Sequence, residues 1–203
     1  MASLSQAKTY GGVGSILILL SPAPYAGWLL AIAGFILTLL AVKNISDWFK
    51  DSSIMNNMVI SIVVAIAGVL VGTFILLGSF FRFMGLNGLT FADFGNNFNP
   101  STVPTGDWIG LITWAIAGIA LTWVLLTVSG VFLRRGYSKI GTDLNLGLFG
   151  TAGLLFLIGA ATTIILVGFL ILPIAIILLV VAFFSINENA PPLAQPTITS
   201  QAG

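Results

Sequence analysis

The last apolar run of this chain, from Leu146 to Ser185, contains 40 residues and no charged side chain. A helix crosses hydrocarbon in about 20 residues, because about 30 Å must be covered and lipid offers no partner to an unpaired backbone group. A single helix of this length would extend about 60 Å, twice the thickness it has to cross. Two crossings fit better, and the sequence predicts spans over 146–164 and 167–185, with a reversal near residues 162–168.

Three further spans and one short helix are predicted earlier in the chain. Apolar runs predict further spans over 25–42, 57–81 and 108–133, while the residues before Pro22 and Pro24 predict a short interfacial or re-entrant helix over 11–20. The predicted fold is an all-α polytopic transmembrane bundle of about five spans within one domain, 1–186, followed by a disordered polar tail, 187–203. A four-span alternative, with one tilted helix kinked at Pro173, stays open.

Composition supports a lipid environment. Hydrophobic residues make up 58% of the chain, charged residues only 6%, and the mean hydropathy is +1.10, whereas soluble domains are about 25% charged. A net charge of +1 gives no field to gather nucleic acid, so that partner is excluded. The absence of Cys and His removes disulfides, thiolate chemistry and the usual ligands of zinc, copper and haem. We therefore expect no cofactor, no metal site and no catalytic residue.

Positive charge near the span ends predicts the orientation. More basic residues lie on one side of the membrane than on the other. The side with fewer receives Arg82 and, depending on the side of the N-terminus, Lys8. Because cytoplasmic loops carry the excess of Lys and Arg, we expect a multi-pass protein of the cell membrane with loops 43–56 and 134–145 in the cytoplasm and loop 83–106 outside. The residues that set this orientation are Lys43, Lys50, Arg134, Arg135 and Lys139.

The tetrapeptide AIAG occurs three times, each time inside an apolar run. Lipid gives no hydrophobic gain when helices associate, so association depends on close contact, which small residues permit. Ordinary packing within the chain is favoured for these faces over a dimer seam or a packed conduit. The predicted helix-packing residues are Ala31, Gly34, Ala65, Gly68, Gly72, Ala115, Gly118, Gly147, Gly150 and Gly153.

Basic and acidic residues alternate in the segment KNISDWFKDSSIMNN, which follows the first predicted span. As a short helix it would place Lys43 and Asp47 four residues apart and Asp47 and Lys50 three apart, with Trp48 and Phe49 toward lipid. Asp47 and Asp51 are thus expected to be neutralised by neighbouring lysines. An interfacial anchor is the simpler interpretation, and a docking surface for a partner is the alternative.

No ionisable side chain falls inside a predicted span, which argues against an energised pump. The leading hypothesis is a non-enzymatic structural component or accessory subunit of a membrane assembly, with a protein partner or a second copy of itself. A passive channel or carrier for a small neutral solute, lined by Ser and Thr hydroxyls, is the alternative; those hydroxyls can equally bond to backbone carbonyls of their own helix. An enzyme that grips lipid headgroups through Arg134, Arg135 and Lys139 has the least support, because basic residues at that depth mostly set orientation.

Several segments together resemble a known family. They are LSQAKTYGGVGSIL at 4–17, AVKNISDWFKDSSIMNN at 41–57, LFGTAGLLFLIGA at 148–160, and the following ILVGFLIL and VAFFS. The chain is similar in these stretches to an archaeal family of small integral membrane proteins called domain of unknown function 996. The resemblance implies an archaeal source and a multi-span helical fold, and it supplies no activity and no site residue. The segment at 89–106 is longer than this resemblance leads us to expect.

Overall fold

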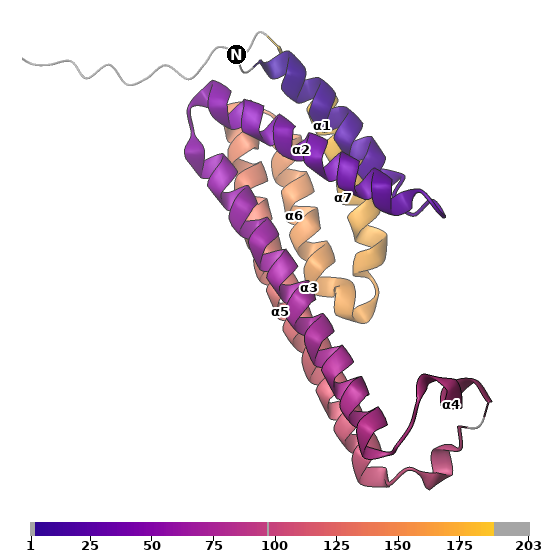
Figure 1. Ribbon diagram of the computed structural model, residues 1–203. Helices are drawn as coiled ribbons and strands as arrows, with labels where there is room; N and C mark the ends of the chain where they lie inside the picture. The colour runs from indigo at the N-terminus through magenta and orange to yellow at the C-terminus, as the bar shows by residue number, and fades with distance from the viewer. Residues whose placement is uncertain (1–2, 97, 189–203) are drawn as a thin grey trace, which may run out of the picture. The chain divides into compact units, whose positions relative to one another are not determined.

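The computed structural model describes residues 3–96 and 98–188, so the predicted disordered tail, 187–203, lies almost entirely outside the described residues. The described part of the chain is helical and contains no strand, which confirms the all-α polytopic architecture (Figure 1). Its elements are α1 (Leu4–Leu19), α2 (Gly27–Phe49), α3 (Ser52–Leu86), α4 (Phe91–Asn96), η1 (Pro100–Thr102), α5 (Thr105–Asp143), α6 (Gly147–Thr162), η2 (Thr163–Ile165) and α7 (Gly168–Phe184).

Four of the described helical segments are long and apolar enough to cross a membrane, namely α2, α3, α5 and the segment Gly147–Ile165. Helix α7 is apolar but shorter. The final apolar run therefore contains two helices, as its length requires. The break between them is held by Leu166 in the left-handed region (φ 66°) and by Gly168, where a Cβ would collide with the carbonyl oxygen of Gly159. Pro173 lies inside α7 without ending it.

The contacts divide the chain into two compact units, to both of which α3 and α5 contribute. The first unit comprises the residues up to Ser61 and from Gly130 onward, and it contains the buried core. Helix α1 packs against α2 and α7, and α6 packs against α7 (Figure 1). The large, fully buried side chains of this core include Leu4, Ile45, Ile54, Ile140, Phe149, Leu179 and Phe183.

Helix α1 begins at Leu4, seven residues before the predicted short helix, because Ser3 caps it: the Ser3 hydroxyl oxygen accepts a hydrogen bond from the Gln6 amide at 3.2 Å. Its glycines allow close packing. The ring of Phe183 occupies the place that a Cβ of Gly11 would take, and a Cβ on Gly14 would lie 2.7 Å from the carbonyl oxygen of Gly34. Helix α1 is therefore an integral part of the first unit.

Three further helices, α2, α3 and α5, also extend past the predicted spans, whereas α6 and α7 lie within theirs. Helix α2 continues to Phe49, α3 begins at Ser52, and α5 continues to Asp143 instead of ending at Leu133. The polar residues beyond the apolar runs retain helical geometry because their inner faces still pack: Tyr137 and Ile140 of α5 are buried in the core of the first unit. The predicted loops 43–56 and 134–145 are thus mostly helix, and hydropathy alone does not mark where such helices end.

The second unit, Ile62–Ser129, consists of the adjoining parts of α3 and α5 and the segment between them. Aromatic side chains organise that connecting segment. The rings of Phe83 and Trp108 lie 4.9 Å apart, Phe98 lies 6.2 Å from Trp108, and Phe91 contacts Phe80 and Phe81 at 6.1 Å. These contacts cover the ends of α3 and α5.

Candidate functional site

The three AIAG copies have one burial pattern. In each, the first Ala is partly buried, the Ile and the second Ala are exposed, and the Gly is buried. Residues three apart lie on the same side of a helix, so the first and last positions face the interior while the middle positions face outward. The interior positions are Ala31 with Gly34 in α2, Ala65 with Gly68 in α3, and Ala115 with Gly118 in α5.

In the second unit, Gly68 and Gly72 of α3 and Gly118 of α5 lie at one helix contact. A Cβ on Gly68 would lie 2.8 Å from Leu125 Cβ, a Cβ on Gly72 would collide with the Thr122 hydroxyl, and one on Gly118 would lie 3.1 Å from Ile75. The Thr122 hydroxyl donates to Gly118 O at 2.9 Å and lies 3.3 Å from Gly68 O across the contact. Backbones approach closely here, and larger side chains do not fit.

The three glycines at the start of α6 differ from one another. A Cβ on Gly153 would lie 3.0 Å from Tyr137 and 3.1 Å from Arg134 of α5, whereas one on Gly147 or Gly150 would meet no described atom within 4 Å. Backbone contact still occurs near Gly150, because a Cβ on Gly141 would lie 3.3 Å from its amide nitrogen. The helix-packing role of these small residues stays a prediction, which the Gly72 variants discussed below test.

The hydroxyls that could have lined a conduit bond mostly to their own backbone. Thr122, Thr127 and Thr163 donate to carbonyl oxygens four residues earlier at 2.7–2.9 Å, and Ser79 donates to Leu76 O at 2.8 Å. Such bonds satisfy a hydroxyl without any ligand. The residues that the structure describes also contain no group of three or more acidic, Cys or His side chains able to hold a metal ion.

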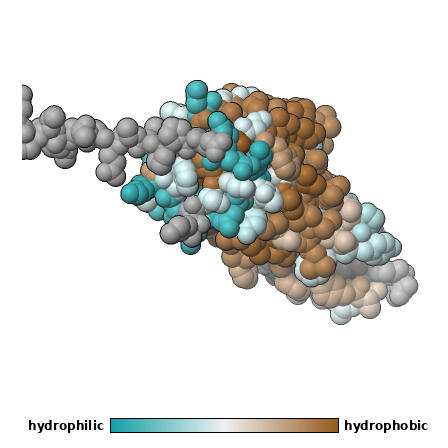
Figure 2. Space-filling model, turned by 90° about the horizontal axis from the view of Figure 1, so that it is seen from above, coloured by the Kyte–Doolittle hydropathy of each residue, from teal (hydrophilic) through white to brown (hydrophobic). Residues whose placement is uncertain are grey.

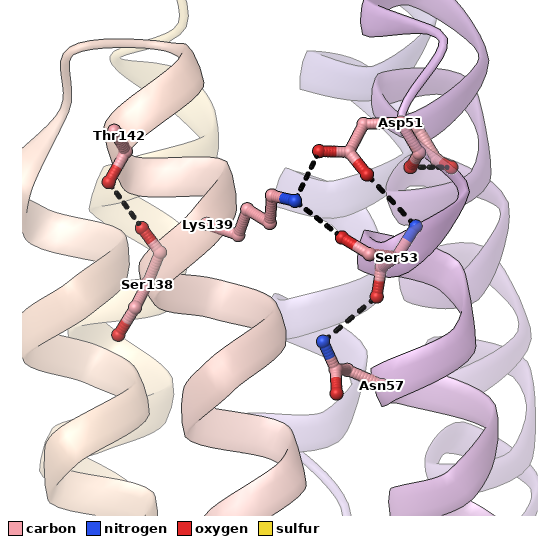
Figure 3. Close-up of polar contacts among 7 residues, drawn as sticks. Asp51, Ser53, Asn57, Ser138, Lys139 and Thr142 are labelled. Carbon is pink, nitrogen blue, oxygen red and sulfur yellow. Dashed lines mark hydrogen bonds and ion pairs between the residues drawn. The ribbon is translucent and has the colours of Figure 1, made fainter.

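The densest polar cluster joins the start of α3 to the end of α5 within the first unit (Figure 3). The ammonium group of Lys139 lies 2.6 Å from Asp51 Oδ2 and donates to the Ser53 hydroxyl oxygen at 2.6 Å. Asp51 Oδ1 accepts from the Ser53 amide at 2.9 Å, and Asn57 Nδ2 donates to Ser53 O at 2.9 Å. Lys139 therefore ties α5 to a segment more than 80 residues earlier in the chain.

Local structure places Asp51 for this role. Helix α2 ends at Phe49, Lys50 adopts the left-handed conformation (φ 53°), and the Asp51 amide donates back to Ser46 O at 3.0 Å, which is the usual way in which an αL residue closes a helix. Asp51 then caps α3 through the Ser53 amide. The hydrogen bond from Lys139 holds the pKa of Asp51 below its usual value, assisted by the bonds from Ser53 and opposed by partial burial.

An open groove of about 730 Å³ lies along this cluster. Its basic side chains, Arg134, Arg135 and Lys139, come from α5, and Val131 of α5 with Leu157 of α6 supplies apolar lining. The polar remainder of the lining is Ser53, Asn57, Ser138 and Thr142. Hydrophilic side chains gather on one region of the molecule, beside a surface that is mainly hydrophobic (Figure 2).

The residues predicted to set orientation separate into two groups. Arg134, Arg135 and Lys139 line the groove, whereas Lys43 and Lys50 line a different hollow with Asp47. Neither lysine forms an ion pair with Asp47 in the described residues, where the ion pairs are Lys139 with Asp51 and Lys8 with Glu188. The side of the membrane on which these groups lie stays a prediction.

Sequence reasoning missed the partnership of Ser53, Asn57, Ser138 and Thr142 with the basic residues. One signal was present: Arg134, Ser138 and Thr142 recur every four residues, which places them on one side of a helix. That signal requires helical structure beyond Leu133, where the predicted span ended. The pairing of Asp51 with Lys139 had no local signal, because it is a tertiary contact.

The sequence of this chain is similar to known proteins. Residues 30–177 match the family described as "Protein of unknown function (DUF996)". The chain is also 30% identical to an uncharacterized protein of Methanocaldococcus jannaschii over 186 residues, which cover 92% of this chain and 94% of the relative. No solved structure matches. The match covers most of α2 to α7 and therefore the groove as well, and we conclude that the chain belongs to the DUF996 family.

Proposed function

We propose that this protein is a non-enzymatic component or accessory subunit of a membrane assembly, and that the α3–α5 hairpin of the second unit is its docking element. The observation that supports this proposal most is a set of glycines on the hairpin that no part of the described chain fills. A Cβ on Gly78, Gly85, Gly106 or Gly110 would meet no described atom within 4 Å. In lipid, exposed small residues are the positions at which another helix backbone can approach.

The extent of exposed apolar surface supports the same proposal. In the most apolar 18-residue stretch of α3 and of α5, 17% of the residues are buried, compared with 33% in α2. Two adjoining shallow hollows on the hairpin, of about 120 and 220 Å³, share Ser79, Arg82 and Trp114, and one of them includes Gly110 and the other Gly78. A partner helix seated there would gain close backbone contact beside an aromatic ring and a cation.

Purification under gentle conditions tests this proposal. A tagged chain is extracted from its own membranes into polymer-bounded lipid discs, and the mass of the particle is measured. We expect an assembly with a second protein or a second copy of the chain, and the mass distinguishes these two partners. Recovery of the chain alone and monomeric would overturn the proposal.

A pair of variants locates the interface. Gly78→Leu with Gly110→Leu fills the open positions of the hairpin and should release the partner without changing the thermal unfolding of the chain. Gly147→Leu is the matched control, because Gly147 is also unfilled but lies on α6 in the first unit. Loss of the partner in the control and not in the hairpin variant would place the interface elsewhere.

The alternative, a passive channel or carrier, has weaker support because most of the candidate hydroxyls are bonded to backbone carbonyls. Flux of small neutral solutes into liposomes that contain the protein discriminates the two functions. The proposed subunit role predicts the same flux as in empty liposomes. Solute-selective flux that Gly68→Leu or Gly72→Leu abolishes would favour the channel.

A further inference from the structure

We propose that the groove between the start of α3 and the end of α5 is a binding site for one anionic phospholipid, with its phosphate at Arg134 and Arg135 and the first part of an acyl chain along Val131 and Leu157. This inference is independent of the subunit role proposed above. It rests on three features of the groove: unneutralised positive charge, the order of polar and apolar lining along the helix, and its position at the end of the apolar segments.

The charge is the first feature. No acidic residue lines the groove. Lys139 is engaged by Asp51 at 2.6 Å, whereas neither Arg134 nor Arg135 has an ion pair in the part of the chain that the structure describes. Arg135 instead lies over the ring of Phe132, 5.5 Å from its centre. Two guanidinium groups on adjacent residues offer the planar, paired donors that phosphate oxygens accept.

The order of the lining is the second feature. Leu157 of α6 lies level with Gly130 of α5, since a Cβ on Gly130 would lie 3.3 Å from its Cα. Val131 is the next residue of α5, Arg134 and Arg135 follow about one turn later, and Lys139 lies about 12 Å of helix beyond Val131. Apolar lining therefore gives way to basic lining in one direction along the groove, which is the order of chain and headgroup in a phospholipid.

The position of the groove is the third feature. It occurs where the apolar run of α5 ends and where Ser53 and Asn57 precede the apolar run of α3. At this level a bilayer changes from hydrocarbon to phosphate, and basic residues there attract anionic lipid. A free phosphate ion would gain nothing from Val131 and Leu157, so the apolar end of the groove favours a lipid over the free anion.

Native mass spectrometry of the detergent-purified full chain tests this proposal. The probes are dioleoylphosphatidylglycerol and dioleoylphosphatidylcholine, which share their chains and differ in net charge. Arg134→Gln with Arg135→Gln should weaken phosphatidylglycerol binding about 30-fold, because each basic residue near anionic lipid contributes about fivefold. Lys43→Gln with Lys50→Gln removes the same charge outside the groove and should change binding less than about twofold.

Two further arms keep the outcomes distinct. Arg134→Lys with Arg135→Lys retains the charge but not the planar paired donors and should recover part of the affinity, and an unchanged thermal unfolding of the Gln variant shows that its loss of affinity does not come from misfolding. Inorganic phosphate at the same concentration should not displace the lipid. Equal losses in the two Gln double variants would reduce the effect to net charge, and displacement by inorganic phosphate would assign the site to a free anion; either result overturns the proposal.

Discussion

Gly72 of α3 is the position at which the close approach of α3 and α5 can be tested most sharply. A Cβ added there would collide with the Thr122 hydroxyl and lie 3.1 Å from Thr122 Cβ and 3.2 Å from Gly118 O. Thr122 can escape the collision only by rotating about χ1, which removes its hydrogen bond to Gly118 O and its contact with Gly68 O. The smallest substitution, Gly72→Ala, therefore perturbs packing and hydrogen bonding together.

The magnitude follows from three terms. Overpacking a tight contact costs about 1–3 kcal/mol, and a lost hydrogen bond between membrane helices costs about 0.6 kcal/mol, up to about 1.7. Replacing Gly by Ala in a helix returns about 1 kcal/mol. Gly72→Ala should therefore destabilise the chain by about 1–3 kcal/mol. Gly78→Ala, six residues later on the same helix, meets no described atom within 4 Å and should be neutral or stabilising by up to about 1 kcal/mol.

Unfolding in mixed micelles with increasing dodecyl sulfate, followed by the fluorescence of the five tryptophans, measures both variants. Thr122→Ala in the Gly72→Ala background removes the colliding oxygen and should recover about 1 kcal/mol or more relative to the sum of the single changes. If Gly72→Ala and Gly78→Ala had free energies of unfolding within about 0.5 kcal/mol of each other, the contact between α3 and α5 would not have the geometry described.

Two other perturbations have outcomes set by the structure. Asp51→Asn removes the charge that faces Lys139 and keeps a capping side chain. Because the pKa of Asp51 is lowered in the folded chain, the charged carboxylate stabilises the fold above pH of about 4. This contribution to stability is lost on further acidification. The variant should therefore lose less stability between pH 7 and pH 3 than the parent, by no more than about 1 kcal/mol for a partly exposed pair, in thermal unfolding followed by circular dichroism. Gly34→Val should lower the free energy of unfolding, measured by dodecyl sulfate titration, by more than about 2 kcal/mol. A Cβ at this position would lie 2.5 Å from Gly14 O, a backbone atom that cannot rotate away. Unchanged stability would mean that α1 does not pack on α2 as described.

The interior of this fold was the part most accessible to sequence reasoning. Apolar length predicted the multi-span helical architecture and the break between α6 and α7, because an unpaired backbone is so costly in lipid that crossings have a nearly fixed length. The spacing within AIAG concerns helical periodicity instead, and the packing role of these residues stays a prediction. Its first and last residues are the more buried ones in all three copies, and only a helix places residues three apart on one side.

The helix ends and the groove were less accessible. Hydropathy measures partition into lipid, and it has no term for a helix that continues into water because its inner face is still packed. Tyr137, which lies four residues beyond the predicted end of α5, is only 4% exposed because Phe149 and Phe156 of α6 pack against it. The groove depends on that extension, since Ser138, Lys139 and Thr142 belong to the part of α5 that hydropathy assigned to a loop.

The glycines of α3 show why composition alone could not separate packing inside the chain from packing between chains. Gly68 and Gly72 face α5 at distances that exclude a methyl group, whereas Gly78 and Gly85 of the same helix face no described atom. From Gly72 to Gly78 is six residues, or about 600° of rotation at 3.6 residues per turn, so the two positions point in directions about 120° apart around the helix. A small residue therefore indicates the close approach of another helix backbone only when the side of the helix on which it lies is also known. The side of α3 that carries Gly78 and Gly85 is the one still available to a partner.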